Sequence, residues 1–503
     1  MFIRKNHIVK INVPGGIVAA GLLYSILNAA EKAKVTDVFF GTRQQMFLKV
    51  NDGKLAVLEE ALSKLEIVFE TNTDEYKNIV SSYVTEGVFQ SGNWLSEGVY
   101  KDILDLFDFK PKLKININDN NQTFVPFFTG NINFIASDTS NYWYLYIRFP
   151  KTNRLYCWKA WIYSFDIPRI SKLIEATIFE NRDLFYEKDE ASGDTLHTIV
   201  HAKENFVTQA ITEELLLPNF ALPYYEGFNR YANKTWLGIY RRDELFPVAF
   251  LKEVCLICRK TKIGQLYITP WKSLIIKGID SADRKLWDLV LGKYRINVRH
   301  ASNELNWQVE DLSEEALTLK RYIIRHFDRD DVRTYGLCFA IKTGPKTGLF
   351  GSVIIRKKEN GSYNQRKALD RYDILYTKDF KPNSKEVLLF RKDIEKENLG
   401  VYLVSLCKYF YEQQSQEDSI LHHIYRDEQA VIKEQVKDTT TIYQCKHCLT
   451  VYDGVFGDES NNVPPNTSFE ELTNTYECPV CNAPKEDFKL LEKGSTLYAQ
   501  MPV

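Results

Sequence analysis

Four cysteines near the C-terminal end of the sequence constrain the fold more than any other feature. They form two Cys-x-x-Cys pairs, Cys445 with Cys448 and Cys478 with Cys481, and 29 residues (449–477) separate the pairs. Two such knuckles bring four thiolates to the corners of one tetrahedron, and the backbone N–H groups of each knuckle turn toward the sulfur atoms. A tetrahedral site of four thiolates selects zinc or iron, and the spacing alone does not decide between the two metals.

The residues around these cysteines favour iron. The segment contains short motifs such as Val451-Tyr452-Asp453, and its aromatic residues are Tyr443, Tyr452, Phe469, Tyr476 and Phe488. The stretch 443–488 resembles rubredoxin along its whole length, a family that binds one iron ion through four cysteines and carries single electrons. The resemblance implies that the iron ligands are Cys445, Cys448, Cys478 and Cys481. A structural zinc ribbon built on the same cysteines remains the alternative.

Two positions depart from the rubredoxin pattern. The residue after the second cysteine of each knuckle is usually glycine, because the backbone there favours positive φ, but this chain has Leu449 and Asn482. Asparagine tolerates the left-handed region, whereas leucine does so poorly. We also expect Leu449 to cover the metal more than glycine would, which alters solvent access and the reduction potential.

The long N-terminal part contains a strand–helix–strand pattern twice. The expected elements are a strand at 8–13, a helix from Gly15-Gly16 to about Lys34 and a strand at 41–50, then a strand at 237–241, a helix near 247–261 and a strand within 264–278. Two copies this far apart in the sequence predict two related halves rather than a solenoid.

These copies resemble the ferredoxin-like half-domains of the sirohaem-dependent nitrite and sulfite reductases. The resemblance rests on Thr42-Arg43-Gln44, on the segment that begins Lys77-Asn78, and on the paired lysines in 110–115. It implies that four cations line the cofactor pocket and hold an oxyanion through converging positive charge, namely Arg43, Lys77, Lys112 and Lys114. Because Lys112 and Lys114 are two residues apart, we expect them to share one face of a strand.

The cysteines that hold the four-iron cluster of these reductases are missing. The remaining cysteines are Cys157, Cys255, Cys258, Cys338 and Cys407, at spacings unlike the Cys-x5-Cys and Cys-x3-Cys of the family. We therefore expect neither an Fe4S4 cluster nor sirohaem. No glycine-rich phosphate loop or dinucleotide fingerprint supports a flavin or nicotinamide site. Cys255 and Cys258 are predicted to lie on a buried helix face, and His197 and His201 to be ordinary surface or core histidines.

Composition limits the partners and the location. Lys plus Arg (65) balance Asp plus Glu (66), so neither nucleic acid nor an anionic membrane is an expected partner. No run of about 18 apolar residues exists to span a membrane. Pro14-Gly15-Gly16 and Asn28 argue against a signal peptide, and an odd number of cysteines, nine, fits a reducing compartment. We expect a cytoplasmic protein that meets a redox partner protein, either a reductase or an electron donor.

The sequence thus predicts an α+β chain with two ferredoxin-like reductase-type halves and a small rubredoxin domain. The expected domains are a first half (1–225), a second half (226–411), a linker (412–440), the rubredoxin domain (441–493) and a tail (494–503). We expect an electron carrier rather than a catalyst, in nitrite or sulfite assimilation; if the chain is an enzyme, it is an oxidoreductase. The alternatives are an active sirohaem-type oxyanion reductase and a zinc-binding structural or assembly protein.

Overall fold

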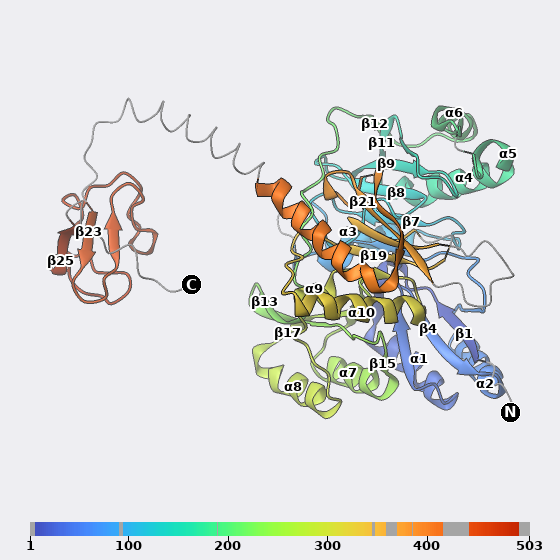
Figure 1. The fold of residues 1–503 in the computed structure, drawn as a ribbon, viewed down its shortest axis with the longest axis horizontal. Coiled ribbons are helices and arrows are strands. Elements are labelled where there is room, and N and C mark those ends of the chain that lie inside the picture. Colours follow the sequence, from blue (N-terminus) through green and yellow to red (C-terminus); the bar gives the residue numbers. More distant parts are fainter. Residues whose placement is uncertain are drawn as a thin grey trace. The chain divides into compact units, whose positions relative to one another are not determined.

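The computed structural model describes residues 6–89, 94–188, 190–344, 348–358, 370–384, 386–415 and 442–491. The chain divides into two compact units, Met1–Tyr411 and Glu412–Val503. The expected tail (494–503), and the expected linker from residue 416 onward, lie outside the described residues. Figure 1 shows helices and sheets mixed through the first unit, so the predicted α+β class is confirmed.

The two halves form two five-stranded sheets that exchange strands. One sheet has the order β15-β3-β4-β1-β5, with β1 (Asn6–Ile11), β3 (Asp37–Phe40), β4 (Met46–Asn51), β5 (Glu70–Thr71) and β15 (Phe246–Pro247). The other has the order β13-β14-β17-β16-β2, with β2 (Ile17–Ala19), β13 (Gly227–Tyr231), β14 (Lys234–Ile239), β16 (Gln265–Ile268) and β17 (Leu274–Ile279). Each half therefore gives one short strand to the sheet of the other.

Helices α1 (Ala20–Lys32) and α7 (Val248–Lys260) pack against each other in a core shared by both halves. Helices α2 (Asp52–Lys64) and α8 (Arg284–Lys293) flank this pair. Cys255 and Cys258 are fully buried on α7, which confirms the predicted buried helix face. Burial of this kind is the usual environment of a thiol that acts as a small apolar side chain.

Three predicted element boundaries were wrong, each because a tight turn interrupts the pattern. The first helix begins at Ala20 rather than at Gly15-Gly16, since both glycines have positive φ (67° and 74°) and the next three residues form β2. The expected strand at 41–50 begins only at Met46, after a turn in which Gln44 has φ 60°. The expected strand within 264–278 is two strands, β16 and β17.

Two further sheets complete the first unit. The third has the order β12-β11-β9-β8-β7-β6, and β10 pairs with β9. Its strands are β6 (Ile79–Ser81), β7 (Ile115–Asn118), β8 (Ile132–Ala136), β9 (Tyr142–Arg148), β10 (Leu155–Cys157), β11 (Ala160–Tyr163) and β12 (Thr208–Ala210). Its helices are α3 (Glu97–Asp105), α4 (Ile167–Glu180), α5 (Arg182–Phe185) and α6 (Gly193–Lys203).

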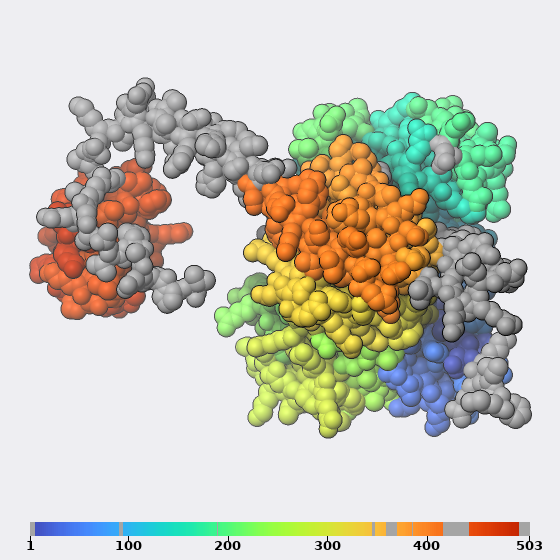
Figure 2. Space-filling model, in the orientation of Figure 1, coloured from blue at the N-terminus to red at the C-terminus, as the bar shows by residue number. Residues whose placement is uncertain are grey.

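The fourth sheet has the order β18-β19-β20-β21-β22. It contains β18 (Trp307–Val309), β19 (Phe339–Lys342), β20 (Val353–Lys357), β21 (Arg371–Thr377) and β22 (Val387–Glu395), with α9 (Ser302–Leu305), α10 (Glu314–Arg329) and a helical segment at 399–415. Figure 2 shows α10 and this sheet, in yellow and orange, as one continuous surface with the rest of the first unit.

The second unit is a small sheet around an aromatic core. Its order is β24-β23-β25, with β23 (Ile442–Cys445), β24 (Val451–Asp453) and β25 (Phe488–Leu491). Tyr443 stacks on Phe469 with ring centroids 4.0 Å apart, and Tyr452, Tyr476 and Phe488 complete the cluster. Elsewhere, short 3-10 turns include η1 (Pro14–Gly16), η2 (Tyr83–Thr85), η3 (Ser164–Asp166), η4 (Ser281–Asp283), η5 (Lys378–Phe380), η6 (Lys396–Asn398), η7 (Glu459–Asn461) and η8 (Lys485–Asp487). In the part of the chain that the structure describes, every helix is too short or too polar to cross a membrane.

Candidate functional site

The four cysteines of the two knuckles converge in the second unit. Their sulfur atoms all lie within 4.8 Å of one another, with 3.7 Å between Cys445 and Cys481 and 3.4 Å between Cys448 and Cys478. A tetrahedron of thiolates at about 2.3 Å from a metal has sulfur atoms about 3.8 Å apart. The donor set and its spacing therefore fit one iron ion, as the rubredoxin resemblance implied.

Each knuckle closes through the same backbone hydrogen bonds. Leu449 N donates to Cys445 O at 3.1 Å, and Asn482 N donates to Cys478 O at 2.9 Å. Both residues have positive φ, 63° for Leu449 and 55° for Asn482, so the turn keeps its shape although neither is glycine. Leu449 thus holds a conformation that costs a non-glycine residue about 1–2 kcal/mol.

The two knuckles expose their second cysteines and bury their first. Cys445 and Cys478 are fully buried, Cys448 is partly exposed and Cys481 is exposed. The hydroxyl of Thr450 lies 3.0 Å from Cys448 Sγ and helps to lower the pKa of that thiol to about 6. A thiolate at neutral pH is the form that binds a metal. Because the second cysteine of each knuckle is the more exposed one, one side of the sulfur cage is close to solvent.

The first unit has a polar cavity of about 320 Å³ beside the Thr42–Gln45 turn. Arg43, Lys77 and Lys114, three of the four predicted cations, line this cavity, whereas Lys112 is not among its lining residues. Arg43 is buried and donates to Asn78 O at 2.8 Å, to Ile115 O at 3.0 Å and to Asn116 Oδ1 at 3.2 Å. Its guanidinium is therefore largely engaged in tying the turn to the third sheet.

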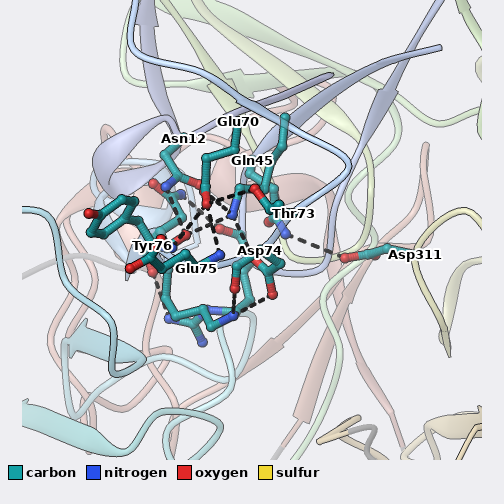
Figure 3. A network of polar contacts seen from close by, with 12 residues as sticks. Asn12, Gln45, Glu70, Thr73, Asp74, Glu75, Tyr76 and Asp311 are labelled. Carbon is teal, nitrogen blue, oxygen red and sulfur yellow. Dashed lines mark hydrogen bonds and ion pairs between the residues drawn. The ribbon is translucent and has the colours of Figure 1, made fainter. Parts of the chain in front are cut away.

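A segment rich in acids, residues 70–76, neutralises two of the predicted cations (Figure 3). Asp74 forms ion pairs of 2.5 Å with both Lys10 and Lys77, and Glu75 pairs with Lys112 at 2.8 Å. Burial alone would raise the pKa of Asp74, but the hydrogen bonds and charges of the two lysines outweigh it and hold that pKa below its usual range. Glu75 likewise raises the pKa of Lys112. We call residues 70–76 the acidic strap.

Lys10 anchors the acidic strap. Its buried ammonium group pairs with Glu70 and Asp74, both at 2.5 Å, and donates to Tyr76 O at 2.7 Å. Figure 3 shows Glu70, Asp74 and Tyr76 gathered together, with Asp311 reaching Gln45 from the other side. The sequence contains a signal for this arrangement, because three acids precede Lys77 within seven residues of it.

Lys114 differs from the other three candidates. The expectation that Lys112 and Lys114 share a strand face was wrong, because β7 begins only at Ile115. Burial, followed by the charges of Arg43, Arg148 and Lys77, lowers the pKa of Lys114 to about 8. Within the described residues Lys114 has no carboxylate partner. Sequence reasoning also missed Arg148, at the end of β9, and Lys342, at the end of β19, which line an adjoining cavity of about 130 Å³.

Neither cavity fits a tetrapyrrole. Ligand pockets for drug-sized molecules span about 300–1,000 Å³, and a sirohaem is larger than such molecules. No cysteine lines either cavity, and Cys338 is buried beside Ser352, which donates its backbone N–H to the sulfur at 3.4 Å. The residues present therefore do not suit a haem held by a thiolate.

Comparison with known proteins identifies the family of the second unit. Residues 442–488 match the rubredoxin family. The chain is 51% identical over 53 residues to "Probable Rubredoxin-1" of Methanocaldococcus jannaschii, covering 10% of this chain and 66% of that protein. It is 40% identical over 63 residues to "Probable rubredoxin" of Methanothermobacter thermautotrophicus, covering 12% of this chain and 98% of that protein. Through this segment the chain belongs to the rubredoxin family, and its four cysteines form a rubredoxin-type site for one iron ion.

The larger part of the fold also has a solved relative. The structure of the Mycobacterium tuberculosis NirA protein aligns with a TM-score of 0.59 and 12% sequence identity, over 79% of this chain and 80% of that one. At this identity the match establishes the fold alone. It confirms the predicted resemblance of the N-terminal part to the reductase fold.

Proposed function

We propose that the chain is a single-electron carrier in which a rubredoxin domain is joined to a reductase-type scaffold that has lost its own redox centre. The observation that carries the proposal is the convergence of Cys445, Cys448, Cys478 and Cys481 within one small domain of rubredoxin sequence. When bound, iron supplies a one-electron ferric–ferrous couple. The protein's contribution is to hold four thiolates in fixed geometry and to leave one side of them accessible.

The accessible side of the cage supports an exchange of electrons with another protein. Cys481 is exposed; Leu449, which follows Cys448, is 60% exposed, and Val480, which precedes Cys481, is 68% exposed. Apolar side chains at such a surface exclude water when a partner covers them. We infer that electrons enter and leave beside Cys448 and Cys481.

The reductase-type fold supports a setting in nitrite or sulfite assimilation in the cytoplasm, where the first unit would recognise the redox partner. The two alternatives to the carrier function are an active sirohaem-type reductase and a zinc-binding assembly protein. The pairing of Lys77 and Lys112 with strap carboxylates, together with the small cavity, favours the carrier over the reductase.

A visible spectrum before and after dithionite, together with metal analysis of the purified full chain, tests the proposal. We expect one iron per chain and thiolate-to-iron bands that bleach on reduction, without macrocycle bands. Tetrapyrrole bands would show that the reductase alternative is right and the carrier proposal wrong. A colourless protein with one zinc ion would favour the assembly protein instead. Cys478→Ser should lose the iron bands, whereas Cys157→Ser, which alters an exposed cysteine outside the cage, should keep them.

A further inference from the structure

Of the four cations that the reductase pattern designates, Lys114 differs from the other three in its partners. Lys77 and Lys112 are paired with carboxylates, and Arg43 is engaged with carbonyl oxygens. Lys114 and Lys342 have no ion pair or side-chain hydrogen bond among the described residues. Arg148 has one side-chain hydrogen bond, Nη2 donating to Thr129 O at 2.8 Å.

These three residues, the basic triad Lys114, Arg148 and Lys342, surround two adjoining cavities. Lys114 lines the larger cavity, Arg148 and Lys342 line the smaller one, and both cavities include Thr129, Gly348 and Leu349 among their walls. Burial lowers the pKa values of all three, and Arg148 lowers further those of Lys114 and Lys342. Burying cations that repel one another costs free energy unless an anion binds between them.

Gly348 marks the position where an anion fits. A methyl group placed on its Cα would lie 3.8 Å from Arg148 Nη2 and 3.9 Å from Lys114 Nζ, with no closer neighbour. The absence of a side chain therefore leaves open the space that two of the cations approach.

Other charged groups near the triad are already engaged. Glu310 accepts hydrogen bonds from Thr343 N at 2.9 Å and Gly344 N at 2.8 Å, and it raises the pKa of Lys342 only as the last of several influences. Arg356 pairs with Asp373 at 2.9 Å. Asp74 raises the pKa of Lys114 but is paired with Lys10 and Lys77, so neither Glu310 nor Asp74 forms an ion pair with the triad.

We propose that the basic triad binds a compact oxyanion with two negative charges, of the size of phosphate or sulfate, seated against Gly348. Three cations match two or more negative charges, and bidentate contact from a guanidinium suits the oxygen atoms of such an ion. The smaller cavity, about 130 Å³, accommodates an ion of five heavy atoms but not a tetrapyrrole. The site belongs to the first unit and the iron centre to the second, so anion binding neither requires nor excludes electron transfer.

Isothermal titration of the iron-loaded full chain with inorganic phosphate, with sulfate and with nitrite, at constant ionic strength in chloride, tests the proposal. We expect saturable binding of phosphate and sulfate, and at least tenfold weaker binding of the planar monoanion nitrite. Arg148→Gln should weaken phosphate binding at least tenfold. Gly348→Ala should do the same without changing any charge, because its methyl group would occupy the anion's place at an ordinary contact distance.

Lys112→Gln is the matched control, since it removes a lysine that is paired with Glu75 outside the cavity. It should bind phosphate as tightly as the unmodified chain. If phosphate and sulfate show no binding beyond chloride, if nitrite binds as tightly as they do, or if Lys112→Gln weakens binding as much as Arg148→Gln, the site does not exist as proposed. The iron spectrum should be unchanged in all these variants, which separates this outcome from a failure of the carrier function.

Discussion

The side-chain amide of Gln44 pairs with the backbone of Ser81 as a neighbouring strand would. Gln44 Nε2 donates to Ser81 O at 3.1 Å, and Ser81 N donates to Gln44 Oε1 at 2.9 Å. Both residues are fully buried, and Ser81 belongs to β6, the edge strand of the third sheet. Gln44 therefore seals a sheet edge that would otherwise leave backbone groups unsatisfied.

Replacing this amide by a carboxylate should destabilise the first unit. In Gln44→Glu an acceptor would face Ser81 O, and a buried charge would lie without a counter-ion. We expect a loss of about 2–3 kcal/mol in the free energy of unfolding, measured by urea denaturation at pH 7. Gln209→Glu, on the exposed strand β12, is the control and should change stability little. Equal effects in both variants would show that the Gln44–Ser81 pair is unimportant.

The iron site should stabilise its own domain and nothing else. Cys478→Ser removes a fully buried ligand, and because metal binding and folding are coupled in small metal domains, we expect loss of iron and unfolding of residues 442–491. Calorimetry should then show one transition fewer, while the transition of the first unit stays at its original temperature. A large shift in the unfolding temperature of the first unit would contradict the division into independent units.

Leu449 should be replaceable with a gain in stability. Leu449→Gly removes the strain of φ 63° and should stabilise the second unit by about 1 kcal/mol, measured by thermal unfolding of the iron form. Removal of an exposed apolar side chain beside Cys448 also admits water, which favours the more negatively charged ferrous form and raises the reduction potential. Asn482→Gly is the control, because asparagine tolerates φ 55°; its effects should be smaller. A lower potential in Leu449→Gly would refute the solvent-access argument.

The metal site was predictable because its information is local. Two Cys-x-x-Cys pairs and the residue after each one define the knuckles, and the positive φ values of Leu449 and Asn482 follow from that local geometry. The buried face of α7 was equally readable from helical spacing, since Cys255 and Cys258 lie one turn apart with Leu251 and Val254.

The exchanged strands and the true state of the basic cavity were not predictable in the same way. The three residues of β2 pair with β16, which is far away in the sequence, so local periodicity reads them as the start of a helix. Charge pairing raised a related difficulty: Lys10 is far from Glu70 and Asp74 in the sequence, and only the fold brings it into ion pairs with them. Arg148 and Lys342 belong to strands of two different sheets, and only the fold places both beside one cavity.

The pH dependence of stability should reveal Lys114. Its pKa of about 8 in the folded chain lies below the usual lysine value near 10.5, so the protonated form is disfavoured by folding. Below pH 8 Lys114 is protonated in both the folded and the unfolded state, and the free-energy cost of burying its charge is fully present. Between pH 8 and 10.5 the folded state loses its proton first, so stability rises with pH in that window.

Lys114→Met removes this cost. In buffers free of multivalent anions, the variant should exceed the unmodified chain by about 1–3 kcal/mol at pH 7, and the difference should shrink toward pH 10.5, as measured by urea denaturation across the range. Lys112→Met, which loses a favourable pair with Glu75, should show no such gain. If Lys114→Met is less stable than the unmodified chain at pH 7, then Lys114 is held by a partner and does not carry unpartnered charge.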